Sequence, residues 1–143
     1  MPAHAHADTL SFELTYKNQR VFVNGGTSTY EISDKRLRER STSNHNTVVL
    51  NDCNSSDVWG SFRTGRRAKP INLNVKHFKD SITISCAHDG YTFLPGRPIH
   101  YREWYINNNK LFELIYIDHL INLRYVTDYR KRKYQQQKTQ KGI

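Results

Sequence analysis

Apolar and polar residues alternate with a period of two in several short runs along this chain. The first such run covers residues 10–16 in the text LSFELTY, and a polar turn at 17–19 leads into a second run at 20–23. Because successive side chains of a β-strand point to opposite faces, these two runs predict a hairpin with one apolar face. Further alternating runs, separated by text rich in Gly, Asn and Ser, cover residues 47–50, 71–75, 82–86, 99–106 and 111–117.

One segment has a helical pattern instead, residues 33–40 in the text SDKRLRER. Ser33 is suited to cap its N-terminus, and Asp34 places a negative charge in the first turn, where the helix dipole favours one. No internal repeat or domain boundary interrupts the strand pattern. We predict that residues 9–118 form an antiparallel β-sandwich with this one short helix.

Length and composition limit what the chain can be. Its 143 residues correspond to about one domain. No apolar run approaches the roughly 20 residues that a membrane helix needs, and no signal peptide is readable, so we predict no membrane span and the compartment stays open. Cys53 and Cys86 lack the spacing of a zinc ribbon or a disulfide framework, and we expect both to be ordinary buried thiols.

The positive charge is concentrated at the C-terminus. Residues 124–143 hold seven Lys and Arg against one Asp, which is +6 of the net charge of +9. This segment loses the strand alternation and is rich in Lys, Arg and Gln, so we expect a basic, disordered tail. A nucleic-acid-binding arm is the less favoured interpretation, and we do not expect a nucleic-acid partner.

The N-terminal text HAHAD places His4, His6 and Asp8 at alternate positions. On an extended strand these side chains share one face, which is how a metal site or a proton-transfer site is built. Histidines close to a chain terminus are also commonly solvated and poorly ordered. The residues alone leave both interpretations open.

Five short stretches carry a more specific signal because they occur together and in one order. They are HAHAD at 4–8, VNGGTSTY at 23–30, RSTSNHNTVVL at 40–50, WGSFRTGRRA at 59–68 and HDGY at 88–91. Together they resemble the C-terminal β-sandwich domain of the heparinase II/III-like polysaccharide lyases. The resemblance runs from about residue 2 to about residue 118, and it implies a sandwich domain over residues 1–123. It also implies β-elimination on a uronic-acid polysaccharide, a glycosaminoglycan or an alginate.

The resemblance implies a role for several residues of this chain. His6, Asn24 and His45 match the positions that hold a zinc ion, and His4 matches the active-site imidazole that faces the uronic acid. Asn24 stands where the family has an aspartate, so we expect weakened Zn²⁺ binding because an amide brings no negative charge. Asn24 also suits the start of an N-G-G turn by itself. Our own inference is that Asp8 accepts the free ring N–H of a ligand histidine.

In the family, most other catalytic groups come from a helical toroid that precedes the sandwich, and more strands follow it. This sequence contains text for neither. We therefore expect an incomplete sandwich that does not cleave polysaccharide by itself and that requires the toroid, or a separately encoded partner, together with an acidic polysaccharide substrate. A full-length family member would belong in the periplasm or cell envelope.

Further candidates have a functional and a structural interpretation each. The basic side chains in the 59–69 region suit a groove for anionic sugars or a solvated turn: Arg63, Arg66, Arg67 and Lys69. The text HDGY and IHYREW suggests a second metal set or ordinary structural histidines: His88, Asp89 and His100. The large aromatic residues suit sugar stacking or the core: Trp59, Tyr91 and Trp104.

Two alternatives to the lyase domain remain. A cupin-type metal barrel also uses an H-x-H pair and a distant histidine, but its glutamate follows the pair closely, whereas Glu13 lies seven positions beyond His6. A non-catalytic polyanion-binding module would instead make residues 124–143 the active portion.

Overall fold

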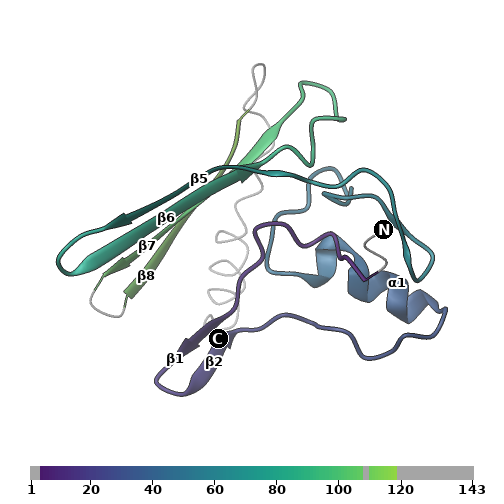
Figure 1. Cartoon of the computed structure of the whole chain (residues 1–143), viewed down its shortest axis with the longest axis horizontal. Coiled ribbons are helices and arrows are strands. Elements are labelled where there is room, and N and C mark those ends of the chain that lie inside the picture. The colour runs from purple at the N-terminus through teal and green to yellow at the C-terminus, as the bar shows by residue number, and fades with distance from the viewer. Residues whose placement is uncertain (1–3, 108–109, 119–143) are drawn as a thin grey trace, which may run out of the picture.

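The computed structural model describes residues 4–107 and 110–118, mostly antiparallel β-strands with one short α-helix (Figure 1). This confirms the predicted fold class. The elements in chain order are β1 (Leu14–Tyr16), β2 (Gln19–Phe22), α1 (Asp34–Arg40), the 3₁₀ turn η1 (Thr42–Asn44), β3 (Val58–Trp59), β4 (Arg63–Thr64), β5 (Pro70–His77), β6 (Ser81–His88), β7 (Ile99–Asn107) and β8 (Lys110–Asp118). The predicted tail, residues 124–143, lies outside the described residues. Within them, no helix has the length and apolar character needed to cross a membrane.

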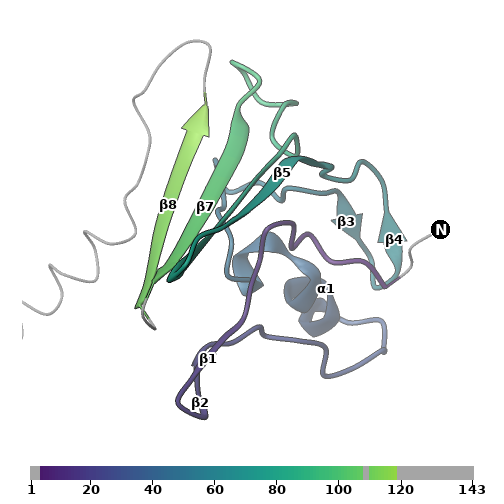
Figure 2. The ribbon, with the colours of Figure 1, turned by 60° about the vertical axis from the view of Figure 1, so that its left-hand side comes forward.

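The main sheet has four antiparallel strands in the order β5-β6-β7-β8. It confirms the four alternating runs predicted between residues 71 and 117, each slightly longer than its apolar text. The register shifts between Ile71 and Asn74 in the edge strand β5, where Asn72 has a φ of 56°. Figure 2 shows this sheet on one side of the molecule and the N-terminal half, with helix α1, on the other.

The N-terminal half contains two short antiparallel ribbons, β1-β2 and β3-β4, in place of a second broad sheet. The predicted hairpin at 10–23 is confirmed, with Lys17 and Asn18 in its turn at φ of 48° and 61°. Strand β1 begins only at Leu14, because its pairing with β2 starts there, opposite Phe22, and Leu10 further upstream adopts a φ of 64°.

Two predicted strand segments are wrong. Residues 47–50 form a single bridge from Leu50 to Cys53, because Asn51 and Asp52 have φ of 51° and 55° and reverse the chain at once. Residues 4–8 are also not a strand. Their backbone is instead held against the end of helix α1, where the Ala7 N–H donates to the Arg40 carbonyl at 2.9 Å.

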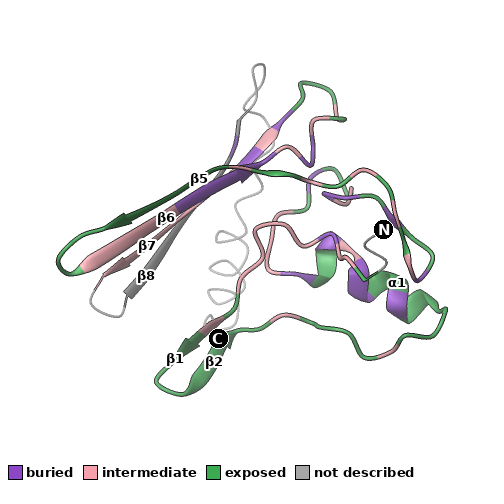
Figure 3. Cartoon of the chain, in the orientation of Figure 1, coloured by how far each residue is buried: buried purple, intermediate pink, exposed green. Residues whose placement is uncertain are grey.

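Among the described residues, the buried interior contains more polar and charged side chains than apolar ones. A small apolar cluster of Leu50, Tyr91 and Ile117 lies between the sheet and the N-terminal half. Figure 3 shows further burial along the second half of β6 and on α1. Cys86 is buried as predicted, and Cys53 is half-buried; both are free thiols. Such an interior requires hydrogen-bond partners for its polar groups.

Candidate functional site

Helix α1 buries a charged face. Ser33 caps the helix by accepting a hydrogen bond from the Arg36 N–H at 3.2 Å, as its sequence position predicted. The buried residues of the helix are Arg36, Glu39 and Arg40. Their spacing of three and four positions places them on one face. Glu39 accepts hydrogen bonds from the backbone N–H and the hydroxyl of Ser28, which lower the pKa of its carboxyl group.

Arg40 holds the loops around the helix together. Its guanidinium is fully buried and donates to the carbonyls of Ala5, Gly60 and Arg63, at 3.1 Å each. Two segments that lie far from the helix in the sequence, the one around Ala5 and residues 60–63, are therefore fixed to the last turn of α1. This arrangement positions residues 4–8 next to η1.

His6 and His45 meet at this point. The His6 Nδ1 lies 3.2 Å from the His45 Nε2, and the two ring centroids are 5.2 Å apart, although the residues are separated by 39 positions. The two segments that contain them are joined by a hydrogen bond, because the Thr42 hydroxyl donates to the Ala7 carbonyl at 2.8 Å. Of the three histidines predicted to converge, His4, His6 and His45, these two are in direct contact.

The outer nitrogens of this histidine pair also have partners. The His6 Nε2 lies 3.0 Å from Arg36 Nη1 and 3.3 Å from Thr27 Oγ1. The His45 Nδ1 lies 2.7 Å from Asn24 Oδ1. Asn24 therefore reaches the histidine pair through the nitrogen of His45 that faces away from His6. Its role as a zinc ligand stays a prediction.

Burial lowers the pKa of both His6 and His45, and the neighbouring positive charge of Arg36 lowers the pKa of His6 further. Asp8 opposes this by raising both values through space. Within residues 4–107 and 110–118, no hydrogen bond joins the Asp8 carboxylate to either ring, so the hydrogen bond inferred for it is not formed here. The shared strand face on which that inference depended does not exist.

His4 lies on the exposed side of the same cluster. Its ring contacts Tyr30 and Phe62 edge-on, with centroid distances of 5.4 and 5.9 Å. The Arg36 guanidinium lies over these two rings at 5.5 and 6.0 Å from their centroids. Arg36 thus contacts both His6 and the aromatic pair that holds His4. Sequence reasoning missed Arg36, Tyr30 and Phe62, although the two aromatic residues stand inside the stretches that carried the family resemblance.

The donor set around His6 and His45 does not complete a zinc site as it stands. Their facing nitrogens, 3.2 Å apart, suit two ligands of one tetrahedral zinc ion, which lie about 3.3 Å apart for bonds of roughly 2.0–2.1 Å. A third donor is missing, because the Asn24 oxygen is engaged with the outer His45 nitrogen. Among the described residues, no group of three His, Cys, Asp or Glu side chains is arranged to hold a metal.

The basic residues predicted to line a sugar groove have different environments. Arg66 pairs with Asp57 at 2.8 Å, donates to the carbonyls of Ser55 and Gly90, and lies over the Phe93 ring, so it has a structural role. Arg63 and Arg67 are exposed, as is Lys69. These three remain available to an anionic ligand.

For His88, Asp89 and His100, the sequence left a second metal set and structural histidines as alternatives, and their contacts fit the structural one. His88 and His100 are fully buried and hydrogen-bonded to each other at 2.8 Å, whereas the Asp89 carboxylate accepts from the Lys69 backbone N–H. Tyr91 is a core residue, since its hydroxyl donates to the Val48 carbonyl from a fully buried position.

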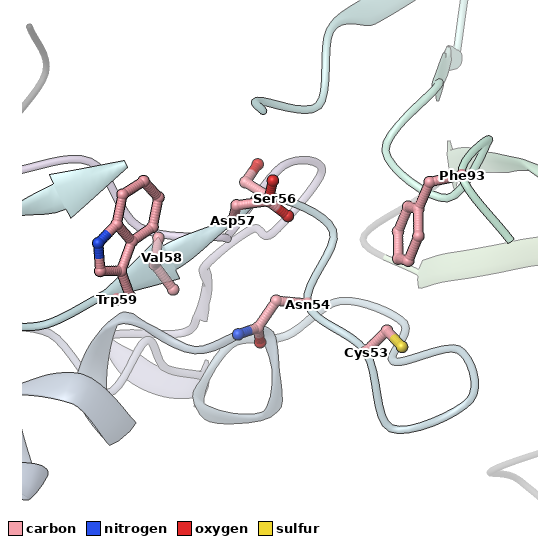
Figure 4. Close-up of a pocket in the computed structure, with 7 residues that line it drawn as sticks. All are labelled: Cys53, Asn54, Ser56, Asp57, Val58, Trp59 and Phe93. Carbon is pink, nitrogen blue, oxygen red and sulfur yellow. The ribbon is translucent and has the colours of Figure 1, made fainter. Parts of the chain in front are cut away.

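A shallow pocket of about 350 Å³ lies elsewhere, between Trp59 and Phe93 (Figure 4). These two aromatic side chains are 46% and 49% exposed, which separates Trp59 from the core aromatic residues. None of His4, His6 and His45 lines this pocket. The lining residues are Cys53, Asn54, Ser56, Asp57, Val58, Trp59 and Phe93.

A comparison with known protein families identifies the family of the domain that contains His4, His6 and His45. The model described as "Heparinase II/III-like, C-terminal" matches residues 1–122. The chain belongs to the heparinase II/III-like family. This confirms the resemblance noted in its sequence and decides against the cupin alternative. Searches of curated proteins and of solved structures found no match. The heparinase II/III-like family is one of polysaccharide lyases, and the clustered His4, His6 and His45 all lie within the matched residues.

Proposed function

We propose that this heparinase II/III-like domain forms one side of the active site of a lyase that cleaves a uronic-acid polysaccharide by β-elimination. The observation that carries the proposal is the position of His4. Its imidazole is exposed, yet it is held by Tyr30 and Phe62 at the edge of the cluster formed by His6, Arg36 and His45. An oriented, solvent-accessible imidazole is suited to exchange a proton with a bound sugar.

The chemistry explains the surrounding charges. In β-elimination the uronic acid loses its C5 proton to a base, negative charge grows on its carboxylate, and the C4 oxygen leaves with a proton. His4 is the residue proposed to face the uronic acid and to take part in these proton transfers. The exposed Arg63 and Arg67 supply positive charge that attracts an acidic polymer. The remaining groups are proposed to come from a helical toroid.

A lyase assay tests this proposal directly. We expect the 143-residue chain alone to release no unsaturated product, measured by ultraviolet absorbance, from heparan sulfate, hyaluronan or alginate. Together with a helical toroid domain, cleavage of one of these polymers is expected. His4→Ala should then lower kcat by about 10²- to 10⁴-fold, the usual contribution of a positioned acid or base.

His77→Ala is the matched control, because His77 is an exposed histidine on β5 outside the cluster. It should leave the rate unchanged. Full activity of His4→Ala, or steady cleavage by the chain alone, would contradict the proposal. Deleting residues 124–143 separates it from the polyanion-binding alternative, since only a binding module would lose its affinity for the polymers with the tail.

A further inference from the structure

Arg36 is an unusual neighbour for a histidine that is expected to bind a cation. Its side chain is fully buried, and among the described residues no carboxylate forms an ion pair with it. Its Nη1 instead lies 3.0 Å from both the His6 Nε2 and the Thr27 hydroxyl. A buried guanidinium therefore directs its charge at the histidine pair.

The hydrogen-bond network assigns the protons of both rings. A guanidinium can only donate, so the His6 Nε2 accepts from Arg36 and carries no hydrogen. The neutral His6 ring then has its proton on Nδ1, which faces the His45 Nε2 at 3.2 Å. His45 in turn has its proton on Nδ1 and donates to Asn24 Oδ1 at 2.7 Å. The Gly26 N–H also donates to this oxygen, which agrees with its role as an acceptor.

A metal ion bound between the rings would require lone pairs on His6 Nδ1 and His45 Nε2. The first of these atoms carries a proton as long as Arg36 donates to the other nitrogen of His6. Moving that proton to Nε2 frees the lone pair of Nδ1. The Nε2–H can then donate a hydrogen bond to Thr27 Oγ1, which lies 3.3 Å away. Arg36 cannot remain, because two hydrogen donors would face each other and its charge would repel the metal ion.

We propose that Arg36 is a positioning residue that holds His6 and His45 as a metal-free, hydrogen-bonded pair, so that Zn²⁺ binds the pair only when the guanidinium leaves His6. This inference does not depend on the lyase activity. It concerns the affinity of the chain for a metal, which is measured separately.

Removing the guanidinium tests the proposal. Arg36→Met keeps an unbranched side chain beside Tyr30 and Phe62 but has no charge and no hydrogen donor. We expect it to bind Zn²⁺ about 10- to 100-fold more tightly than the unmodified chain, the size of effect that residues around metal ligands exert. Calorimetric titration measures the affinity, and the visible spectrum of added Co²⁺ reports tetrahedral binding.

Arg38→Met is the matched control, because Arg38 is an exposed arginine on the same helix. Its Zn²⁺ affinity should equal that of the unmodified chain. Unchanged or weaker Zn²⁺ binding by a folded Arg36→Met chain would overturn the proposal.

A second measurement needs no variant. Long-range proton–nitrogen NMR spectra of the unmodified, metal-free chain distinguish the two neutral forms of each histidine. We expect both His6 and His45 to carry their proton on Nδ1. A proton on the Nε2 of His6 would show that Arg36 does not donate there and would overturn the proposal even if Arg36→Met does not fold.

Discussion

At the scale of single residues, His88 and His100 form a second, deeply buried histidine pair. They face each other across β6 and β7 and have no exposed surface. The Gly90 N–H donates to His88 Nδ1 at 3.0 Å, so His88 carries its proton on Nε2 and donates to His100 Nδ1. The proton of His100 is then on Nε2, which has no acceptor among the described residues. In the part of the chain that the structure describes, neither ring has an acceptor for the hydrogen bond that a second proton would donate.

Burial lowers the pKa of His88 to about 4 and that of His100 to about 3, from an ordinary value of 6.5. The unfolded chain therefore binds more protons than the folded chain below pH 6.5, and stability falls as the pH falls from there toward 4. We expect the free energy of unfolding by urea to drop by about 4 kcal/mol between about pH 7 and about pH 5, roughly 2 kcal/mol for each histidine. His77→Gln should show the same drop, because that residue is exposed. Equal stability at both pH values would contradict this.

At the scale of elements, helix α1 depends on its ends. It has seven residues, and helices shorter than about 12 residues are marginal without tertiary support. Its first turn is held by the Ser33 cap and its last turn by the hydrogen bonds of Arg40. Between these ends the helix presents Arg36 to His6, so the stability of the helix and the geometry of the histidine cluster are linked.

Ser33→Ala removes the side-chain acceptor for the Arg36 N–H and leaves that donor unpaired. We expect the free energy of unfolding to fall by about 1 kcal/mol, measured by urea denaturation. Ser33→Asp retains an acceptor at the cap and should stay close to the unmodified chain. Equal stability of the Ala and Asp variants would show that the cap does not contribute.

At the scale of the whole molecule, polar contacts join the four-stranded sheet to the N-terminal half. Arg102 on β7 is buried and donates from Nη1 to the carbonyls of Leu10 and Asn46. Beside it, Trp104 packs edge-on against Phe12 at a centroid distance of 5.7 Å. The apolar cluster is small, so these contacts carry much of the connection between the two halves.

Arg102→Met should loosen this connection, because the Leu10 and Asn46 carbonyls lose a donor. In hydrogen-exchange experiments we expect amides in residues 7–11 and 42–47 to exchange at least about tenfold faster, which corresponds to about 1.4 kcal/mol of local opening. Lys76→Met, an exposed position on β5, should leave them unchanged. Uniformly faster exchange across β5 and β6 as well would indicate global unfolding and contradict a role confined to the interface.

The sequence by itself determined the elements whose signals are local. The period-two runs predicted the hairpin and all four strands of the main sheet, because strand side chains alternate between two faces. Ser33 and Asp34 marked the start of α1, because capping depends on residues within one turn. The proximity of His6 and His45 was predicted only from the five stretches that resemble the family. No local pattern contains this information, because it concerns a tertiary contact.

Only the tertiary structure decided which charged side chains are buried and what they contact. In the text SDKRLRER, Arg36 and Arg40 have the same appearance as the exposed Arg38. They are buried because distant loops supply carbonyls, hydroxyls and an imidazole around them. The alternating run at 47–50 does not form a strand, because its one β-bridge joins Leu50 to the nearby Cys53. Burial and strand pairing depend on partners that lie tens of residues away, and the protonation of His6 is set by one of them, Arg36.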